Sequence, residues 1–379
     1  MRRLLFLRGR LIAAACAVLA CGGCNVIVVD GNYFYVAPDA GHGGPSPGCS
    51  PETCSGVCSS DHCVITLASS QLFPLGVAID SNFVYWVNGG TNPGGAVFDG
   101  TVQKVPIHGG QPITLAAQQG FPFSMAVNAS HVYWGNAGTG LDNADGTIES
   151  ALLDGGSPAT LAANQAAPQT IAIDETHIYW ITANADLSGS VLQMPIGGGP
   201  ITVLASDPGG PTSLAVDATD VYFTVSGKTG KDGKVQKVPI GGGTVTTLSE
   251  EQNDPQGIAI DGSHVYWATS GMNGSGNTVT NGTIMQAELD GSQQVILAWL
   301  QAQPSQIAID GTSVYFANSG TAANGKHDGT IMKVPIGGGP LTTLVSGQSS
   351  LYDVAVDATS VYFTVSGPNV GAVLSTSKN

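Results

Sequence analysis

Acidic and histidine side chains recur at fixed positions along this chain and are the first candidates for chemistry. An acidic or amide residue closes the same short apolar run seven times, at Asp80, Asn128, Asp174, Asp217, Asp261, Asp310 and Asp357. Converging carboxylates could bind a metal ion or transfer protons. Asp and Asn before a tight turn also accept hydrogen bonds from backbone N–H groups. Because turn residues follow in every copy, we interpret the series as structural.

Histidine recurs in the same way. His131, His177 and His264 each precede a run of the type VYW or IYW. A catalytic His is a singular residue, whereas these three share one repeated hairpin position, so we interpret them as structural too. His327, in the loop KHDGT, has no obvious nucleophile or base as a partner.

Asp-Gly and Asn-Gly pairs recur before another apolar run, and we interpret them as turn chemistry. One of these loops, LDNADGT, carries Asp142, Asn143 and Asp145, whose oxygens could hold Ca²⁺ if a further carboxylate converged. It lacks the Gly and the distal Glu of an EF-hand loop. We therefore predict no metal ion and no cofactor.

These residues belong to a stretch that occurs seven times. Residues 254–271, DPQGIAIDGSHVYWATSG, have close copies beginning at Phe73, Phe121, Ala167, Gly210, Gln303 and Ser350. A full unit contains four short runs of alternating apolar and polar residues, as expected of strands. The first run carries Ala, which suits a crowded central axis, and the second carries Tyr followed by Trp or Phe. Repeats of this kind indicate a β-propeller.

The two ends of the repeat region complement each other. After Tyr362 the last unit has one more strand, GAVLSTS, and its fourth strand is missing. CVITLASS at 63–70 is a fourth strand with no blade before it. We predict an all-β, seven-bladed β-propeller of four-stranded antiparallel blades over residues 63–379. The N-terminal strand completes the last blade and removes an open sheet edge.

The first 20 residues are predicted to be a secretory signal peptide, with an Arg-rich start and an apolar run too short to span a bilayer. The segment VLAC ending at Cys21 resembles a bacterial lipobox, in which the Cys is lipidated. Ordinary cleavage beside an incidental Cys is the alternative, and Cys24 and Cys16 are weaker candidates. Residues 21–62 are a predicted spacer. Its segment 26–37, VIVVDGNYFYVA, is interpreted as a tether or docked strand, or as a degenerate eighth blade.

Four cysteines lie close together at the end of this spacer, at Cys49, Cys54, Cys58 and Cys63. In an exported protein they predict two disulfides, with three possible pairings. Zinc is the alternative, but neither pair has the usual C-x2-C spacing.

The charge distribution excludes some partners. All four Arg lie in the first ten residues, and the remainder has 8 Lys against 27 acidic residues, a net charge of −19. Nucleic acid needs a basic footprint, and an anionic membrane surface would repel such a domain. We therefore expect no nucleic acid, contact with the membrane only through the N-terminal lipid, and a monomer.

The repeat resembles known propeller families. The unit AELDGSQQVIL, preceded by IAIDGSHVYWATSG, resembles the YWTD repeat of lipoprotein-receptor propellers, and the Pro-x-x-hydrophobic-Ala start is similar to NHL and lactonase-type propellers. YWTD propellers typically have six blades, whereas seven are counted here. These families include receptors, scaffolds, lyases and lactonases, so the resemblance implies architecture rather than activity. The whole chain resembles bacterial surface lipoproteins.

By analogy with other propellers, ligands are expected at the mouth of the central channel, beside the two residues that precede each inner strand. The candidate ligand-binding residues there are Phe123, Ser124, Gln169, Thr212, Gln256, Gln306, Tyr352 and Asp353. Amide, hydroxyl and aromatic side chains suit a neutral polar ligand, such as a glycan or a peptide, or an envelope protein. With a single carboxylate, the set favours binding over catalysis. The alternative is a lyase, lactonase or hydrolase that uses Asp353, Tyr352 and His327.

Overall fold

The structure is a computed structural model that describes residues 25–29, 32–36 and 54–379, except 92–96, 140–143, 185, 187, 208, 230, 272–280, 322–327 and 367–370. It divides into two units, Met1–Gly44 and Pro45–Asn379. In the first, β1 (Asn25–Val29) and β2 (Asn32–Val36) form an antiparallel pair with Val26 opposite Tyr35. The predicted signal peptide, Cys21 and Cys49 lie outside the described residues. Among those described, no helix is long and apolar enough to cross a membrane.

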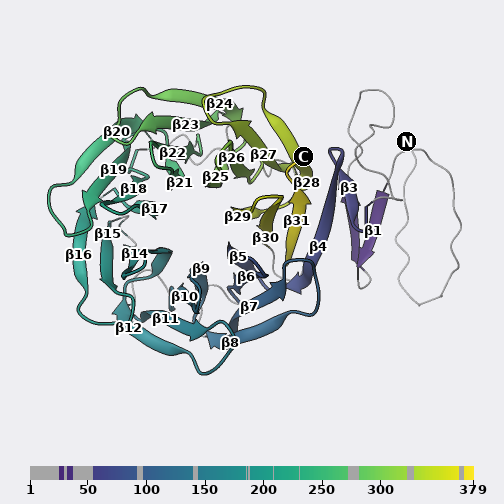
Figure 1. The fold of residues 1–379 in the computed structure, drawn as a ribbon, viewed down its shortest axis with the longest axis horizontal. Helices are drawn as coiled ribbons and strands as arrows, with labels where there is room; N and C mark the ends of the chain where they lie inside the picture. The colour runs from purple at the N-terminus through teal and green to yellow at the C-terminus, as the bar shows by residue number, and fades with distance from the viewer. Residues whose placement is uncertain are drawn as a thin grey trace, which may run out of the picture. The chain divides into compact units, whose positions relative to one another are not determined.

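The second unit is a seven-bladed β-propeller, as predicted, and Figure 1 shows its blades arranged around a centre. The inner strands are β5 (Pro74–Ile79), β9 (Pro122–Val127), β13 (Pro168–Ile173), β17 (Pro211–Val216), β21 (Pro255–Ile260), β25 (Pro304–Ile309) and β29 (Leu351–Val356). The second strands are β6 (Phe83–Asn88), β10 (His131–Asn136), β14 (His177–Ala183), β18 (Asp220–Val225), β22 (His264–Thr269), β26 (Ser313–Asn318) and β30 (Ser360–Val365).

The two remaining strands of each blade lie toward the rim. The third strands are β7 (Gly100–Pro106), β11 (Gly146–Leu152), β15 (Gly189–Pro195), β19 (Gly233–Pro239), β23 (Gly282–Glu288), β27 (Gly329–Pro335) and β31 (Gly371–Ser377). The outer strands of blades 1 to 6 are β8 (Ile113–Gln119), β12 (Ala159–Gln165), β16 (Thr202–Asp207), β20 (Thr246–Gln252), β24 (Val295–Gln301) and β28 (Thr342–Gln348).

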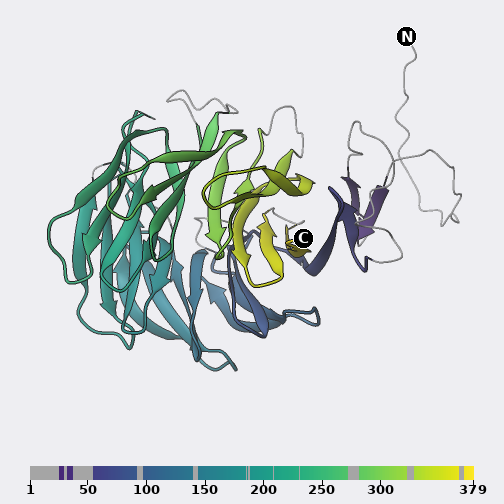
Figure 2. The same ribbon diagram turned by 45° about the horizontal axis from the view of Figure 1, so that its top comes forward.

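The outer strand of blade 7 comes from the other end of the repeat region, which confirms the predicted closure. β4 (His62–Gln71) pairs antiparallel with β31, with Thr66 opposite Leu374. A short strand, β3 (Val57–Ser59), then pairs with β4 as a fifth strand of this blade. Inner strands β29 and β5 lie in contact, so seven blades complete the ring. The turned view in Figure 2 shows the blades as twisted sheets packed side by side.

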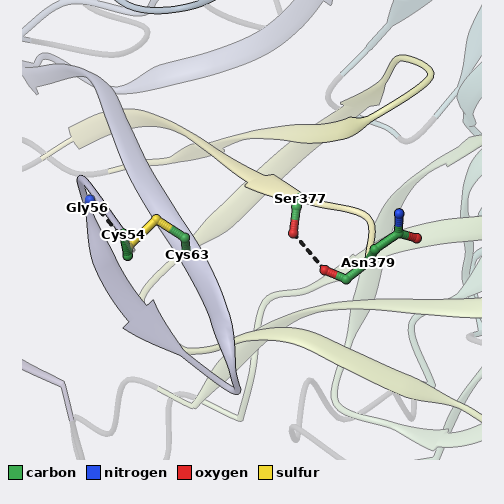
Figure 3. Close-up of a disulfide and its surroundings, with 5 residues drawn as sticks. All are labelled: Cys54, Gly56, Cys63, Ser377 and Asn379. Atoms are coloured by element: carbon green, nitrogen blue, oxygen red, sulfur yellow. Dashed lines mark hydrogen bonds between the residues drawn. A yellow bond between two sulfur atoms is a disulfide. The ribbon is translucent and has the colours of Figure 1, made fainter. Parts of the chain in front are cut away.

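A disulfide closes the hairpin that begins with β3. Cys54 and Cys63 are bonded, with their Cα atoms 5.4 Å apart, and the backbone N–H of Gly56 lies 3.3 Å from the Cys54 sulfur (Figure 3). Cys58 is also disulfide-bonded. The prediction of disulfides in this segment is therefore confirmed for Cys54, Cys58 and Cys63.

The apolar core lies between neighbouring blades. In one cluster Tyr179 and Ile181 of blade 3 pack with Phe223 and Leu214 of blade 4, and in another Leu67 and Tyr362 of blade 7 pack with Trp86 of blade 1. Tyr and the following Trp or Phe point to opposite faces of their strand, so each blade presents a large side chain to both neighbours. This packing explains why the pair recurs.

The Gly of the Asp-Gly and Asn-Gly pairs has a different role from the predicted one. Gly100, Gly146, Gly233, Gly282 and Gly329 begin third strands, and none has a positive φ. A Cβ built at Gly282 would lie 2.4 Å from Cδ of Pro304, which starts the next inner strand. The interpretation as turn chemistry was thus wrong for the Gly, because close packing between blades requires it.

A second contact between blades joins Trp to Gln. The indole N–H of Trp134 donates to Oε1 of Gln119 over 2.8 Å, from blade 2 to the outer strand of blade 1. The other bonds of this kind are Trp86 to Gln71, Trp180 to Gln165 and Trp267 to Gln252. A buried indole N–H left unpaired would cost about 1–3 kcal/mol, so these bonds stabilise the ring.

Candidate functional site

A small cavity of about 150 Å³ lies among the inner strands. All seven blades contribute to its wall, through Gly76, Phe123, Ser124, Met125, Thr170, Ile171, Ser213, Leu214, Ile258, Gln306, Tyr352 and Asp353. Typical sites for drug-sized ligands are larger, at about 300–1,000 Å³. The cavity therefore has room for one small group of a ligand rather than for a large molecule.

Five of the eight predicted residues line this cavity, namely Phe123, Ser124, Gln306, Tyr352 and Asp353. The other three do not: Thr212 and Gln256 are bonded elsewhere, and Gln169 is absent from the wall. Most of the additional wall residues are one position farther along an inner strand, such as Met125, Ile171 and Leu214. The sequence argument considered only the first two residues after the loop Pro, whereas these side chains are the third residue after it.

Polar side chains of the inner strands are largely used to join blades. The Thr170 hydroxyl donates to the Thr212 carbonyl over 3.0 Å, and the Thr212 hydroxyl donates to the Pro255 carbonyl over 2.9 Å. The backbone N–H of Ile171 donates to the Ser124 hydroxyl over 3.3 Å. Each inner strand is the edge of its sheet, so its outward backbone groups lack strand partners. Side chains from the neighbouring blade satisfy them instead.

Asp353 performs this role at the closure between blades 7 and 1. Its Oδ2 accepts the N–H of Val77 over 2.9 Å, and its Oδ1 accepts the N–H of Val354 over 2.8 Å. Beside it, the Thr364 hydroxyl donates to the Leu75 carbonyl over 2.7 Å. Burial raises the pKa of Asp353 to about 6, although both N–H donors favour the charged form. The carboxylate thus bonds to the backbone with both oxygens.

An aromatic corner lies next to this carboxylate. The rings of Phe123 and Tyr352 meet edge to face with centroids 5.4 Å apart, and Phe121 packs on Phe123 at 5.9 Å. Phe123 and Tyr352 come from blades 2 and 7, which flank blade 1. Gly76 of blade 1 lies beside the backbone of Ser124, and a Cβ there would be 2.9 Å from the Ser124 Cα. A side chain at position 76 would therefore force the neighbouring strand to shift.

The amide of Gln306, like the hydroxyls of Ser213 and Tyr352, is a polar group of the wall that no described residue satisfies. No hydrogen bond to its side chain occurs within the described part of the chain, and it lies over Gly257, where a Cβ would be 2.8 Å from Oε1. An amide has two donors and one carbonyl acceptor. Gln306 can therefore present both kinds of group to a ligand.

A second partly buried carboxylate near the inner strands was missed by the sequence argument. Asp254 precedes the Pro of β21, and its oxygens accept bonds from the Ser270 hydroxyl over 2.5 Å and the Gln256 amide over 2.8 Å. Burial raises the pKa of Asp254. The signal was present, since the other copies have Phe, Ala, Gly, Gln or Ser at this position.

The repeated Asp and His residues are structural, as predicted. In blade 5, Oδ1 of Asp261 accepts the N–H groups of Ser263 and His264, each over 2.7 Å, and Oδ2 accepts the Tyr266 hydroxyl over 2.7 Å. Burial first, and then this bond, raise the pKa of Tyr266 well above its usual value. The His264 ring packs 6.0 Å from Tyr266. The Asp therefore closes the turn and anchors the Tyr.

The remaining candidate residues give little support for a metal site. No group of three His, Cys, Asp or Glu able to hold a metal ion occurs among the residues that the structure describes. Asp142, Asn143 and His327 lie outside them. Asp145 accepts the Thr139 hydroxyl over 2.6 Å and so closes the base of its loop.

Known structures share this architecture. An oligogalacturonate lyase in complex with manganese aligns with a TM-score of 0.61 at 11% identity, over 85% of this chain and 94% of that one. The Niastella koreensis GH74 enzyme aligns at 0.60 and 16% identity, over 81% of this chain and 53% of that one. The computationally designed Ika8 protein aligns at 0.53 and 18% identity, over 81% and 98%.

The sequence itself gives no closer relationship. No protein-family model matches it, and no curated protein matches it either. At such identities the structural likeness concerns the fold alone. The chain is thus a β-propeller repeat protein with seven blades, and its activity has to be argued from its own residues.

Proposed function

We propose that this chain is a non-catalytic binding module of the bacterial cell envelope, exported and anchored by a lipid on Cys21. Its propeller binds a neutral polar ligand, a glycan or a peptide, or an envelope protein. The observation that carries the proposal is the composition of the central cavity. All seven blades contribute to it, and its wall combines the unbonded Gln306 amide with the Phe123 and Tyr352 rings.

The state of the one carboxylate in the wall supports binding rather than catalysis. General acid–base catalysis needs a group that is free to move a proton and a partner tuned to a different pKa. Both oxygens of Asp353 already accept backbone N–H groups, one from each of two blades. The hydrogen bonds that join blades 7 and 1 therefore explain why a carboxylate occurs at position 353.

A glycan array and a peptide array with the mature chain would test the binding site. With the ligand found there, we expect Gln306→Ala to weaken binding up to about tenfold, which is the contribution of one hydrogen bond. Gln169→Ala is the matched control, because Gln169 occupies an inner strand but not the cavity wall. Equal losses in both variants would refute the site.

Anchoring is tested separately by Cys21→Ala. The variant should leave the membrane fraction after cell lysis, because on this proposal lipid chains, and not the protein surface, hold the chain at the membrane. A variant that still sediments with membranes would show that the lipid on Cys21 is not the anchor.

The enzymatic alternative rests on the pKa of Asp353, which burial raises to about 6, within the range useful to a general base. If the chain is an enzyme of lyase, lactonase or hydrolase type, Asp353→Asn should abolish turnover and leave binding of the same ligand in place. Turnover that survives in this variant would rule the alternative out.

A further inference from the structure

The outer strands share an exposed bulge. In blade 5, Gln301 pairs with Gly282 and Ala298 pairs with Ile284, so Trp299 and Leu300 together lie opposite the single residue between Gly282 and Ile284, which makes a β-bulge with one extra residue. Six of the seven outer strands carry such a pair, and its second residue has a positive φ in each. The pairs are Ser69–Ser70, Ala117–Gln118, Ala163–Asn164, Glu250–Glu251, Trp299–Leu300 and Ser346–Gly347.

Blade 5 departs from the polar or small character of the other copies. Trp299 is 69% exposed and Leu300 is 75% exposed, whereas the other four Trp of the chain are fully buried. Val295 and Ile296 on the same strand are also exposed. Leu300 has φ of 55°, which is unfavourable for a residue other than Gly, Asn or Asp. A large apolar pair thus occupies an exposed position that also strains the backbone.

The neighbouring blade shows what this position can accept. At the bulge of blade 6, the Ser346 N–H donates to the Ser59 hydroxyl over 3.1 Å, and the Ser60 hydroxyl donates to the Ser346 hydroxyl over 3.0 Å. Ser59 ends β3, the extra strand that pairs with outer strand β4. An extended segment therefore fits along the rim of this propeller, with its turn against a bulge.

Acidic side chains lie beside the start of β24, at the opposite end of the strand from the bulge, and they select among occupants that extend along this strand. Gln294, just before β24, bonds to Leu248 and Ser249 of β20, so the two outer strands are joined there. Exposed Glu250 and Glu251 follow directly on β20, and exposed Asp290 lies in the turn before β24. A partner with Lys or Arg beside its apolar residues complements this surface.

The same charges disfavour two other occupants. A second copy docked through the same face would bring identical acidic side chains together, and its 8 Lys are outnumbered by 27 acidic residues. An anionic lipid surface would be repelled by these side chains as well. Moreover, a stable dimer usually buries about 800 Å² on each partner, whereas one Trp buries about 150–250 Å². Trp299 and Leu300 are therefore large enough to anchor one short segment of a partner, but too small to hold a dimer together.

We propose that Trp299 and Leu300 are the docking site for an extended segment of a partner protein in which apolar residues alternate with Lys or Arg. The site lies on the outer strand of blade 5, so it is separate from the central cavity and does not depend on the function proposed for it.

The test uses a synthetic peptide of alternating Leu and Lys, and a matched peptide of alternating Leu and Glu. Because the other Trp residues are buried, quenching by acrylamide reports mainly on Trp299. We expect the Leu–Lys peptide to protect Trp299 and the Leu–Glu peptide to leave it exposed. The protection should weaken at high salt, because exposed charges are then screened.

Binding is then measured by calorimetry with the double variant Trp299→Ala/Leu300→Asn, which carries the pair found in blade 2. We expect it to bind the Leu–Lys peptide at least about tenfold more weakly. Val203→Thr is the matched control, since Val203 is 56% exposed on the outer strand of blade 3. Gln306→Ala should also leave this affinity unchanged, which separates the site from the cavity.

Several results would overturn the proposal. The double variant could bind the Leu–Lys peptide as tightly as the parent does, or the Leu–Glu peptide could bind equally well. Phosphatidylcholine vesicles could protect Trp299 when neither peptide does, which would assign the pair to a lipid surface. Sedimentation could show a dimer that buries Trp299 without any peptide, which would assign it to a second copy.

Discussion

The inner strands and the outer strands of this propeller use their side chains in opposite ways. At the centre, hydroxyls and the Asp353 carboxylate bond to the backbone of the next blade, as Thr212 does to Pro255. At the rim, the bulges project into solvent, and in blade 5 they present Trp299 and Leu300. Both are edges of a sheet. The inner edges face one another and must be satisfied within the protein, whereas the outer edges are free to vary.

In a repeat protein, partner recognition is expected where one copy differs from the others. A side chain that recurs in every copy, such as the turn Asp or the Tyr of the second strand, holds the scaffold together. A side chain that departs from its copies without a structural reason is a candidate for a partner. Trp299 departs in this way, and so does Gln306, whose amide is unbonded among the described residues.

The largest expected effect tests the closure on which the inner ring depends. A chain that starts at Leu72, without β3 and β4, leaves blade 7 with three strands and exposes the edge of β31. We expect it to lose cooperative thermal unfolding, measured by circular dichroism, and to aggregate. A chain that starts at Cys54 keeps both strands and serves as the control. If the two melt alike, the ring does not require β4.

The next effect concerns packing between blades. Gly282→Ala would place a methyl group 2.4 Å from Pro304 Cδ and 2.7 Å from the Thr269 carbonyl oxygen. Overpacking of this kind should lower the free energy of unfolding in urea by about 3 kcal/mol. Gly262→Ala is the matched control, because no atom beyond its own residue and its two chain neighbours lies within 4 Å of the added Cβ. It should change stability by less than about 0.5 kcal/mol.

A smaller, pH-dependent effect tests Asp353 at the centre. Burial raises its pKa to about 6, above the value of about 3.9 in an unfolded chain, so the folded protein holds this proton more tightly. Its stabilising contribution is therefore complete below about pH 4 and is lost as the pH rises through 6. The difference amounts to at most about 3 kcal/mol.

Urea unfolding of the parent and of Asp353→Asn between pH 4 and 7 measures this contribution. The stability of the parent relative to the variant should decrease as the pH rises. Asp310 provides an opposite control, because the Lys378 ammonium and the Thr312 hydroxyl overcome the effect of burial and lower its pKa. Asp310→Asn should show no such pH dependence between about pH 5 and 7, because a carboxyl with a lowered pKa loses its contribution only below about pH 4. A parent and an Asp353→Asn variant with parallel pH profiles would contradict the assignment.

The smallest expected effect is at the rim, where a substitution should raise the free energy of unfolding instead of lowering it. Leu300→Asn places a residue that tolerates positive φ at the strained position. We expect the free energy of unfolding to rise by about 0.5–1 kcal/mol, even though the docking site is damaged. Val203→Thr should leave stability unchanged. A clear loss of stability in Leu300→Asn would indicate that Leu300 is part of the core and not a surface for a partner.

Much of the scaffold could be predicted from residue patterns. The seven copies, the small Ala of the inner strand and the Asp before each turn follow from local strand and turn chemistry, which short segments carry by themselves. The closure by β4 was also predictable, because CVITLASS matches the fourth strand that the last unit lacks. The candidate site was harder, and three of its eight residues, Gln169, Thr212 and Gln256, are not in the cavity wall.

The architecture follows from residue patterns alone, because the period of alternating residues and the turn residues act over a few positions. The roles of the polar side chains depend on contacts between blades. Whether Thr212 faces a ligand or bonds to Pro255, and whether Gly282 bends a turn or makes room for Pro304, depends on a neighbouring blade some 20 to 45 residues away. Strand twist and the packing of adjacent blades set those contacts, and no local pattern encodes them.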